Sequence, residues 1–138
     1  MAHHERLKFD IPSDFVSARD VQAKIMAAVE SYEYSEDEIF AIKLSLEEGL
    51  INGIKHGNKL DPKKRVKVEA EATANRVEIM IEDEGPGFVK ENVPDPTREE
   101  NLEKCSGRGI LLIETYMSEA EWTKGGRRLR MVFKRKSK

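Results

Sequence analysis

The sequence of 138 residues contains a single cysteine, Cys105. One thiol excludes an internal disulfide and any metal site built from several cysteines, and it is typical of the reducing cytoplasm. The chain lacks any apolar run near the roughly 18 residues that a membrane-spanning helix needs. Residues 1–6 (MAHHER) lack the apolar core of a signal peptide. We therefore expect a cytoplasmic protein with no membrane partner.

An excess of charge of one sign is also missing. The net charge is -2, which argues against general binding to nucleic acid. The segment from Lys124 to Lys138, however, carries many cations and no acid. This segment fits either a strand with a solvated basic face or a contact with an anionic partner or phosphate. With 38% hydrophobic residues, residues 1–138 fit a single domain with a proper core.

The first half of the chain reads as one strand followed by two helices. Residues 7–11 alternate like an edge strand that stops at a proline. Ser13 or Asp14 can cap a helix that extends to about residue 30. Residues 35–38 (SEDE) form a capping box, and the apolar residues that follow keep a helical period until Gly57 offers a natural stop.

The second half reads as four strands and one helix around a long loop. Residues 88–106 show no periodicity and form a loop longer than compact domains usually contain without a use for it. This order predicts an α+β two-layer sandwich, with helices on one face of a mixed, mostly antiparallel sheet. The expected elements are strands at 66–72, 77–82, 120–123 and 129–134, a hairpin turn at 73–76 and a helix at 109–117.

Glu48 and Asn52 lie four residues apart in the second expected helix, so both project from the same face. A carboxylate there can accept a proton from a water or hydroxyl, and an amide oxygen can join the ligand shell of Mg²⁺. Lys55, on the next turn, could neutralise a terminal phosphate. Taken alone, these residues also fit an ordinary polar face of a half-exposed helix.

A second motif, residues 83–87 (DEGPG), comes where a strand ends. Asp83, if half-buried, could accept a hydrogen bond from the exocyclic amine of adenine. Gly85 and Gly87 would let the backbone approach the base and bend away, because glycine takes positive φ cheaply. The alternative for this segment alone is a plain turn.

A third motif, residues 106–109 (SGRG), leads directly into a helix. Backbone amides at a helix start, here around Gly107 and Gly109, bind phosphate without special side chains. Arg108 could add positive charge. This motif alone also fits a helix-entry turn, but the three motifs together, in this order and context, describe a nucleotide pocket with the long loop placed as a lid.

The sequence resembles the GHKL superfamily, with its Bergerat ATP-binding fold, and within it the bacterial anti-sigma-factor serine/threonine kinases. The resemblance covers nearly the whole chain. It rests on the stretches 46–57 (LEEGLINGIKHG), 83–88 (DEGPGF), 94–103 (PDPTREENLE) and 106–110 (SGRGI).

The resemblance implies a role for each matched position. Glu48 would be the catalytic base, Asn52 the Mg²⁺ ligand, Asp83 the reader of adenine, and Gly107 and Gly109 would lie at the phosphates. Residues 88–106 would form the ATP lid. The implied partners are an anti-anti-sigma protein of the STAS type, which is phosphorylated, and a sigma factor, which is held; a homodimer is also compatible.

One position departs from the family pattern. The family often has a glycine-threonine pair entering the last strand, whose hydroxyl helps to bind adenine through water, whereas Arg127 follows Gly126 here. This departure leaves open an alternative, a non-catalytic ATP-binding regulator that sequesters a protein partner. A third reading, the catalytic module of a histidine kinase, is opposed by Glu48, where such modules usually have asparagine. It also needs an upstream dimerisation helix, for which the residues before the second helix leave no room.

Overall fold

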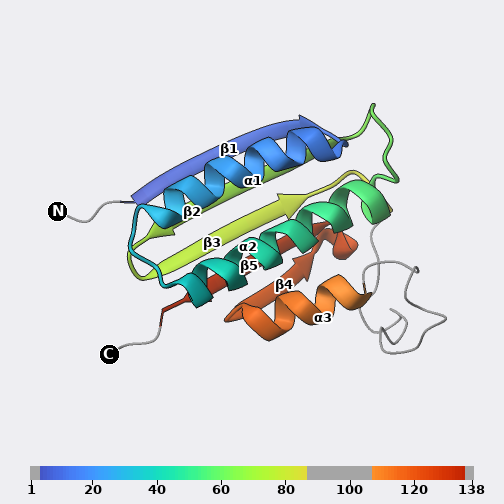
Figure 1. Ribbon diagram of the computed structural model, residues 1–138. Coiled ribbons are helices and arrows are strands. Elements are labelled where there is room, and N and C mark those ends of the chain that lie inside the picture. Colours follow the sequence, from blue (N-terminus) through green and yellow to red (C-terminus); the bar gives the residue numbers. More distant parts are fainter. Residues whose placement is uncertain (1–3, 87–106, 136–138) are drawn as a thin grey trace.

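The computed structural model describes residues 4–86 and 107–135, which form a five-stranded sheet with helices on one face (Figure 1). The strand order is β1-β2-β3-β5-β4, and each of the four pairings is antiparallel. This architecture confirms the predicted α+β sandwich. The strands are β1 (His4–Pro12), β2 (Arg65–Thr73), β3 (Arg76–Glu82), β4 (Glu119–Thr123) and β5 (Arg128–Lys134).

Three helices, α1 (Phe15–Glu30), α2 (Glu36–Ile51) and α3 (Gly107–Tyr116), cover one face of this sheet (Figure 1). The predicted starts of the first two are confirmed. Asp14 caps α1 by accepting a 2.7 Å hydrogen bond from the Ser17 amide, and Ser35 and Glu38 form the reciprocal capping box of α2. Within the described residues, none of the helices is long and apolar enough to cross a membrane.

The core lies between the helices and the sheet. In β2 and β3 every second residue is buried, as the alternation of apolar residues predicts for strands with one covered face. Helices α1 and α2 complete this core from the other side. Its largest fully buried side chains include Ile25, Ile42, Leu46, Leu50, Ile54, Ile79, Ile113 and Met131.

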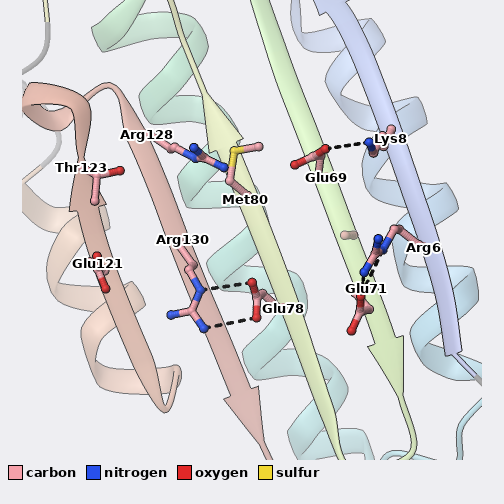
Figure 2. A pocket seen from close by; sticks show the side chains of 11 residues that line it. Arg6, Lys8, Glu69, Glu71, Glu78, Met80, Glu121, Thr123, Arg128 and Arg130 are labelled. Atoms are coloured by element: carbon pink, nitrogen blue, oxygen red, sulfur yellow. Dashed lines mark hydrogen bonds and ion pairs between the residues drawn. The ribbon is translucent and has the colours of Figure 1, made fainter.

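The opposite face of the sheet is polar (Figure 2). Cross-strand ion pairs neutralise its charges, for example between Arg6 and Glu71 at 2.7 Å and between Arg130 and Glu78 at 3.1 Å. The cations of the basic segment take part, since Lys134 lies 2.5 Å from Glu119. These pairs favour the interpretation of that segment as a solvated basic strand face.

The predicted stop of the second helix at Gly57 is correct, but the last part of that helix is not α-helical. After Ile51 the chain continues as a π-helix, η1 (Asn52–Gly57). Its wider turns are closed by bonds such as Asn58 N–H to Gly53 carbonyl at 2.8 Å. Short π segments are frequent at functional sites, because the extra residue per turn re-aims the side chains.

The ends of α2 and β3 and the start of α3 meet at one end of the molecule, on the right in Figure 1. The three motifs found in the sequence therefore converge, although they are separated along the chain. The predicted loop at 88–106 lies outside the described residues.

Candidate active site

The first part of the site lies between α2 and α3. Gly109, in the first turn of α3, faces Glu48 and Asn52 so closely that a Cβ on Gly109 would lie 2.9 Å from Glu48 Oε2 and 3.1 Å from Asn52 Nδ2. The structure thus brings the first and third motifs together. A side chain at position 109 would displace these two polar side chains, so the glycine keeps them close to the start of α3.

Glu48 and Asn52 are both partly buried, and they project from the same side as their spacing predicts. Asn52 Nδ2 is buried and has no hydrogen-bond partner among the described residues. A buried polar group of this kind normally has a partner, so it marks a place where a ligand, water or ion completes the structure. A carboxylate next to such an amide can take up a proton while the amide oxygen binds a cation.

The second part of the site is Asp83, which follows β3. Its carboxylate lies against the π-helix, because a Cβ on Gly57 would lie 2.5 Å from Asp83 Cγ and one on Gly53 would lie 3.7 Å from Asp83 Cβ. Asp83 Oδ1 accepts a 2.7 Å hydrogen bond from the Gly85 amide, and the Asp83 amide donates to the Arg127 carbonyl at 3.0 Å. The carboxylate is therefore held in one position at the end of the sheet.

Burial raises the pKa of Asp83 from its ordinary value of 3.8 to about 6. The hydrogen bond from Gly85 and the positive charges of Arg127 and Lys64 oppose this rise, while the negative charge of Glu82 adds to it. A half-buried carboxylate with such a pKa is typical of functional sites. The expected half-buried position of Asp83 is confirmed.

The positive φ predicted for Gly85 is wrong. Its φ is not positive; among the described residues the glycines with positive φ are Gly125 and Gly126. Gly85 is required instead by space, since a Cβ there would lie 2.1 Å from the Gly57 carbonyl oxygen. Gly87, predicted to share this role, lies outside the described residues.

The structure says less about the other residues predicted to lie near the phosphates. Gly107 begins α3, earlier than the predicted helix start at residue 109, while the side chain of Arg108 lies outside the described part of the structure. Lys55 is exposed and lines a groove between α1 and α2 together with Glu47 and Ile51. Neither Glu48 nor Asn52 lines this groove.

Sequence reasoning missed two residues of this site. Gly57 was predicted only to end a helix, whereas it also provides the surface on which the Asp83 carboxylate lies. Asn58 is completely buried, although the polar residues that follow it in the sequence give no sign of this burial. The glycine could have been found from its place at the end of the first motif; the asparagine carries no such signal.

Comparisons with known proteins agree with this geometry. The histidine kinase-like ATPase domain family matches residues 11–133. An anti-sigma F factor from Oceanobacillus iheyensis is 30% identical over 122 residues, which cover 83% of each chain. A serine-protein kinase, RsbW of Bacillus subtilis, is 28% identical over 92 residues, covering 62% of this chain and 58% of the relative.

A solved structure shares the fold. The crystal structure of the RsbU and RsbW domains of Rv1364c from Mycobacterium tuberculosis superposes with a TM-score of 0.63, at 18% identity, over 94% of this chain and 31% of that one. This likeness agrees with the layered architecture described above. From the match over residues 11–133 and the arrangement of its three motifs, the chain belongs to the histidine kinase-like ATPase domain family.

Proposed function

We propose that the chain is an ATP-dependent protein serine/threonine kinase that acts as an anti-sigma factor. The observation that carries this proposal is the approach of Gly109 to both Glu48 and Asn52, which places a helix start beside a carboxylate and an amide whose Nδ2 has no partner among the described residues. A helix start offers backbone amides to phosphate, and a carboxylate beside it can accept the proton of an attacking hydroxyl. The names of the relatives, anti-sigma F factor and serine-protein kinase, support the same function.

In this proposal the adenine ring and the phosphates of ATP bind at opposite ends of the site. The Asp83 carboxylate accepts a hydrogen bond from the exocyclic amine of adenine, and the backbone at Gly85 and Gly87 lies along the adenine ring. Gly107 and Gly109 present amides to the phosphates. Arg108 adds positive charge to the site, and Lys55, which is exposed on the π-helix, neutralises a terminal phosphate.

The residues present fit Mg²⁺ bound mainly through the nucleotide. Mg²⁺ in phosphate-transfer sites keeps several waters and takes only one or two protein ligands in addition to phosphate oxygens. The described residues contain no group of three or more histidine, cysteine, aspartate or glutamate side chains that could enclose a metal. Asn52 would hold the ion through its amide oxygen, and the ion would neutralise charge on the phosphates.

In the proposed reaction the hydroxyl oxygen of a serine or threonine attacks the γ-phosphorus of ATP. The bond from phosphorus to the β–γ bridging oxygen breaks, ADP leaves, and the hydroxyl proton passes to the carboxylate of Glu48. Catalysis of this kind depends on positioning and on stabilisation of charge. The packing of Gly109 against Glu48 holds the base close to the helix start that would bind the phosphates.

The proposed protein substrate is a small anti-anti-sigma protein of the STAS type, and the proposed sequestered partner is a sigma factor. The name of the relatives from Oceanobacillus and other bacteria supports the second partner. We further propose a cytoplasmic location, a single domain over residues 1–138 with an ATP lid at about 88–106, and the capacity to form a homodimer.

The test is a transfer assay with the protein partner that co-purifies from the native cell and is identified by mass spectrometry. The chain and this partner are incubated with γ-labelled ATP and Mg²⁺, and the products are washed with acid. We expect acid-stable label on the partner, since phosphoserine and phosphothreonine survive acid and phosphohistidine does not. Acid-labile label on this chain would overturn the proposal.

The Glu48→Ala variant is the matched control for this assay, and Glu47→Ala controls for the substitution itself. Glu47 precedes Glu48 on α2 but is exposed, and it lines the groove between α1 and α2. Loss of transfer in Glu48→Ala, with transfer kept in Glu47→Ala, is the expected result. Full ATP binding without any transfer in the unmodified chain would instead favour the non-catalytic regulator.

A further inference from the structure

Asn58, which directly follows the π-helix, is completely buried although it is a polar residue. Its side chain uses both of its polar atoms. Oδ1 accepts a 2.7 Å hydrogen bond from the Glu84 amide, and Nδ2 donates to the Arg65 carbonyl at 2.9 Å and to Ser13 Oγ at 2.8 Å. Its own amide donates to the Gly53 carbonyl at 2.8 Å. A carboxamide is the side chain that accepts at one atom and donates twice at the other.

These bonds connect segments that are distant along the chain. Ser13 lies in the link between β1 and α1, Arg65 begins β2, and Glu84 lies in the turn after β3. Ser13 Oγ in turn donates to the Lys64 carbonyl at 2.7 Å. Because all of these groups are satisfied at once, the side chain of Asn58 has a single fitting orientation.

The turn after β3 depends on this side chain in a specific way. Three successive amides of the turn, those of Asp83, Glu84 and Gly85, are each hydrogen-bonded. The first donates to the carbonyl of Arg127, and the third donates back to the carboxylate of Asp83 itself. The middle amide is held by Asn58, which comes from the segment that follows the π-helix.

The anchor is adjacent to the surface on which the Asp83 carboxylate lies. Gly57, the residue before Asn58, touches that carboxylate, and the Gly57 carbonyl touches Gly85. The side chain of Glu84 adds a second bond to β2, since it accepts from the Arg65 amide. A shift of Asn58 would therefore move the turn relative to Gly57 and change where the carboxylate points.

We propose that Asn58 is a positioning residue for recognition of the purine base: its bond to the Glu84 amide sets the place of the Asp83 carboxylate against Gly57. This inference rests on the proposed binding of ATP. If the inference holds, Asn58 affects only which nucleobase is bound. The phosphate end of the substrate is the task of Glu48 on α2 and Asn52 on η1, which lie next to α3.

The test measures the preference for ATP over inosine triphosphate, which has a carbonyl in place of the exocyclic amine. Dissociation constants for the two nucleotides with Mg²⁺ are measured by calorimetry for the full chain and three variants. Asn58→Ala removes all of the side-chain bonds. Asn58→Asp keeps an acceptor for the Glu84 amide but loses both donations, and Ser13→Ala removes a neighbouring bond while leaving the bond to Glu84.

We expect Asn58→Ala to lower the ATP preference about tenfold, which corresponds to loss of one well-placed hydrogen bond. The transfer rate at saturating ATP should stay within about threefold of the unmodified chain, so that the Michaelis constant changes and the turnover number does not. Asn58→Asp should keep most of the preference, and Ser13→Ala all of it, even where denaturation shows both to be less stable.

Two results would overturn the role of Asn58. One is an unchanged ATP preference in folded Asn58→Ala, and the other is an equal loss of preference in Ser13→Ala, which would indicate a general effect of packing. If Asn58→Ala does not fold at the assay temperature, Asn58→Ser makes the same comparison, because its shorter side chain cannot reach the Glu84 amide. Equal binding of both nucleotides by the unmodified chain would refute base reading by Asp83, and no ATP binding at all would refute the proposed function.

Discussion

Replacing Asp83 by asparagine should make the protein more stable while it weakens nucleotide binding. The carboxylate is half-buried, and burial raises its pKa from 3.8 to about 6. At neutral pH the folded protein therefore holds a charge that would be better solvated in the unfolded chain. Asparagine has nearly the same shape, carries no charge, and can still accept the hydrogen bond from the Gly85 amide.

The magnitude follows from the pKa. At about 1.4 kcal/mol for each unit of pKa, the interval between 3.8 and about 6 corresponds to about 3 kcal/mol before solvent screening is taken into account. Because the side chain is only half-buried, solvent screening reduces this to about 1–2 kcal/mol. The free energy of unfolding of Asp83→Asn should exceed that of the unmodified chain by this amount at pH 8.

The stability gained in Asp83→Asn depends on pH. A carboxyl group whose pKa is raised on folding contributes stability in its neutral form; this contribution is complete below pH 3.8 and is lost as the pH rises through about 6. The advantage of Asp83→Asn should therefore be full at pH 8, still most of its full value at pH 6, about half near pH 5 and only about a fifth at pH 4. Arg127, Lys64 and Glu82 are the charged groups that act on Asp83, and none of them is altered.

The assay is urea denaturation without nucleotide or Mg²⁺ at pH 8, 6 and 4, comparing the two proteins at each pH. Glu121→Gln is a suitable control because it neutralises an exposed carboxylate on the polar face of the sheet. Calorimetry with ATP should show weaker binding by Asp83→Asn. A stability difference that does not change with pH, or a less stable variant at pH 8, would refute the reasoning.

Three further substitutions test the rest of the site. Gly57→Ala places a methyl group about 2.5 Å from the Asp83 carboxylate and should weaken ATP binding about tenfold or more in calorimetry. The control Gly53→Ala, whose new methyl group has ordinary contacts of 3.6 Å or longer, should bind ATP nearly normally. Equal effects of the two substitutions would contradict the packing argument. Gly109→Ala meets Glu48 at 2.9 Å and should slow transfer in the labelled-ATP assay while circular dichroism shows an unchanged fold. Normal transfer by this variant would mean that α3 and Glu48 do not act together. Glu48→Ala should slow transfer by about two to four orders of magnitude and leave ATP binding largely intact, and a retained rate would remove Glu48 as the base.

Local patterns in the sequence were sufficient for the elements of the fold. The alternation in β2 and β3 and the capping box at Ser35 act over a few residues, so they can be read without knowledge of distant contacts. The same holds for the choice of Glu48, which follows from helical spacing and from the motif around it. The layered architecture follows from the order of these elements, because each has one apolar face that must be covered.

Tertiary structure decided how the chemical groups meet. The change from α-helix to π-helix after Ile51, the contact of Gly57 with Asp83, and the bond from Glu84 to Asn58 across 26 residues depend on the packing of β3 against the end of α2. A pKa raised by burial likewise belongs to the folded environment and not to the residue type. Sequence periodicity reports which face of an element is buried, whereas the close approach of two backbones depends on the whole fold, and this difference is why Asn58 was visible only in the structure.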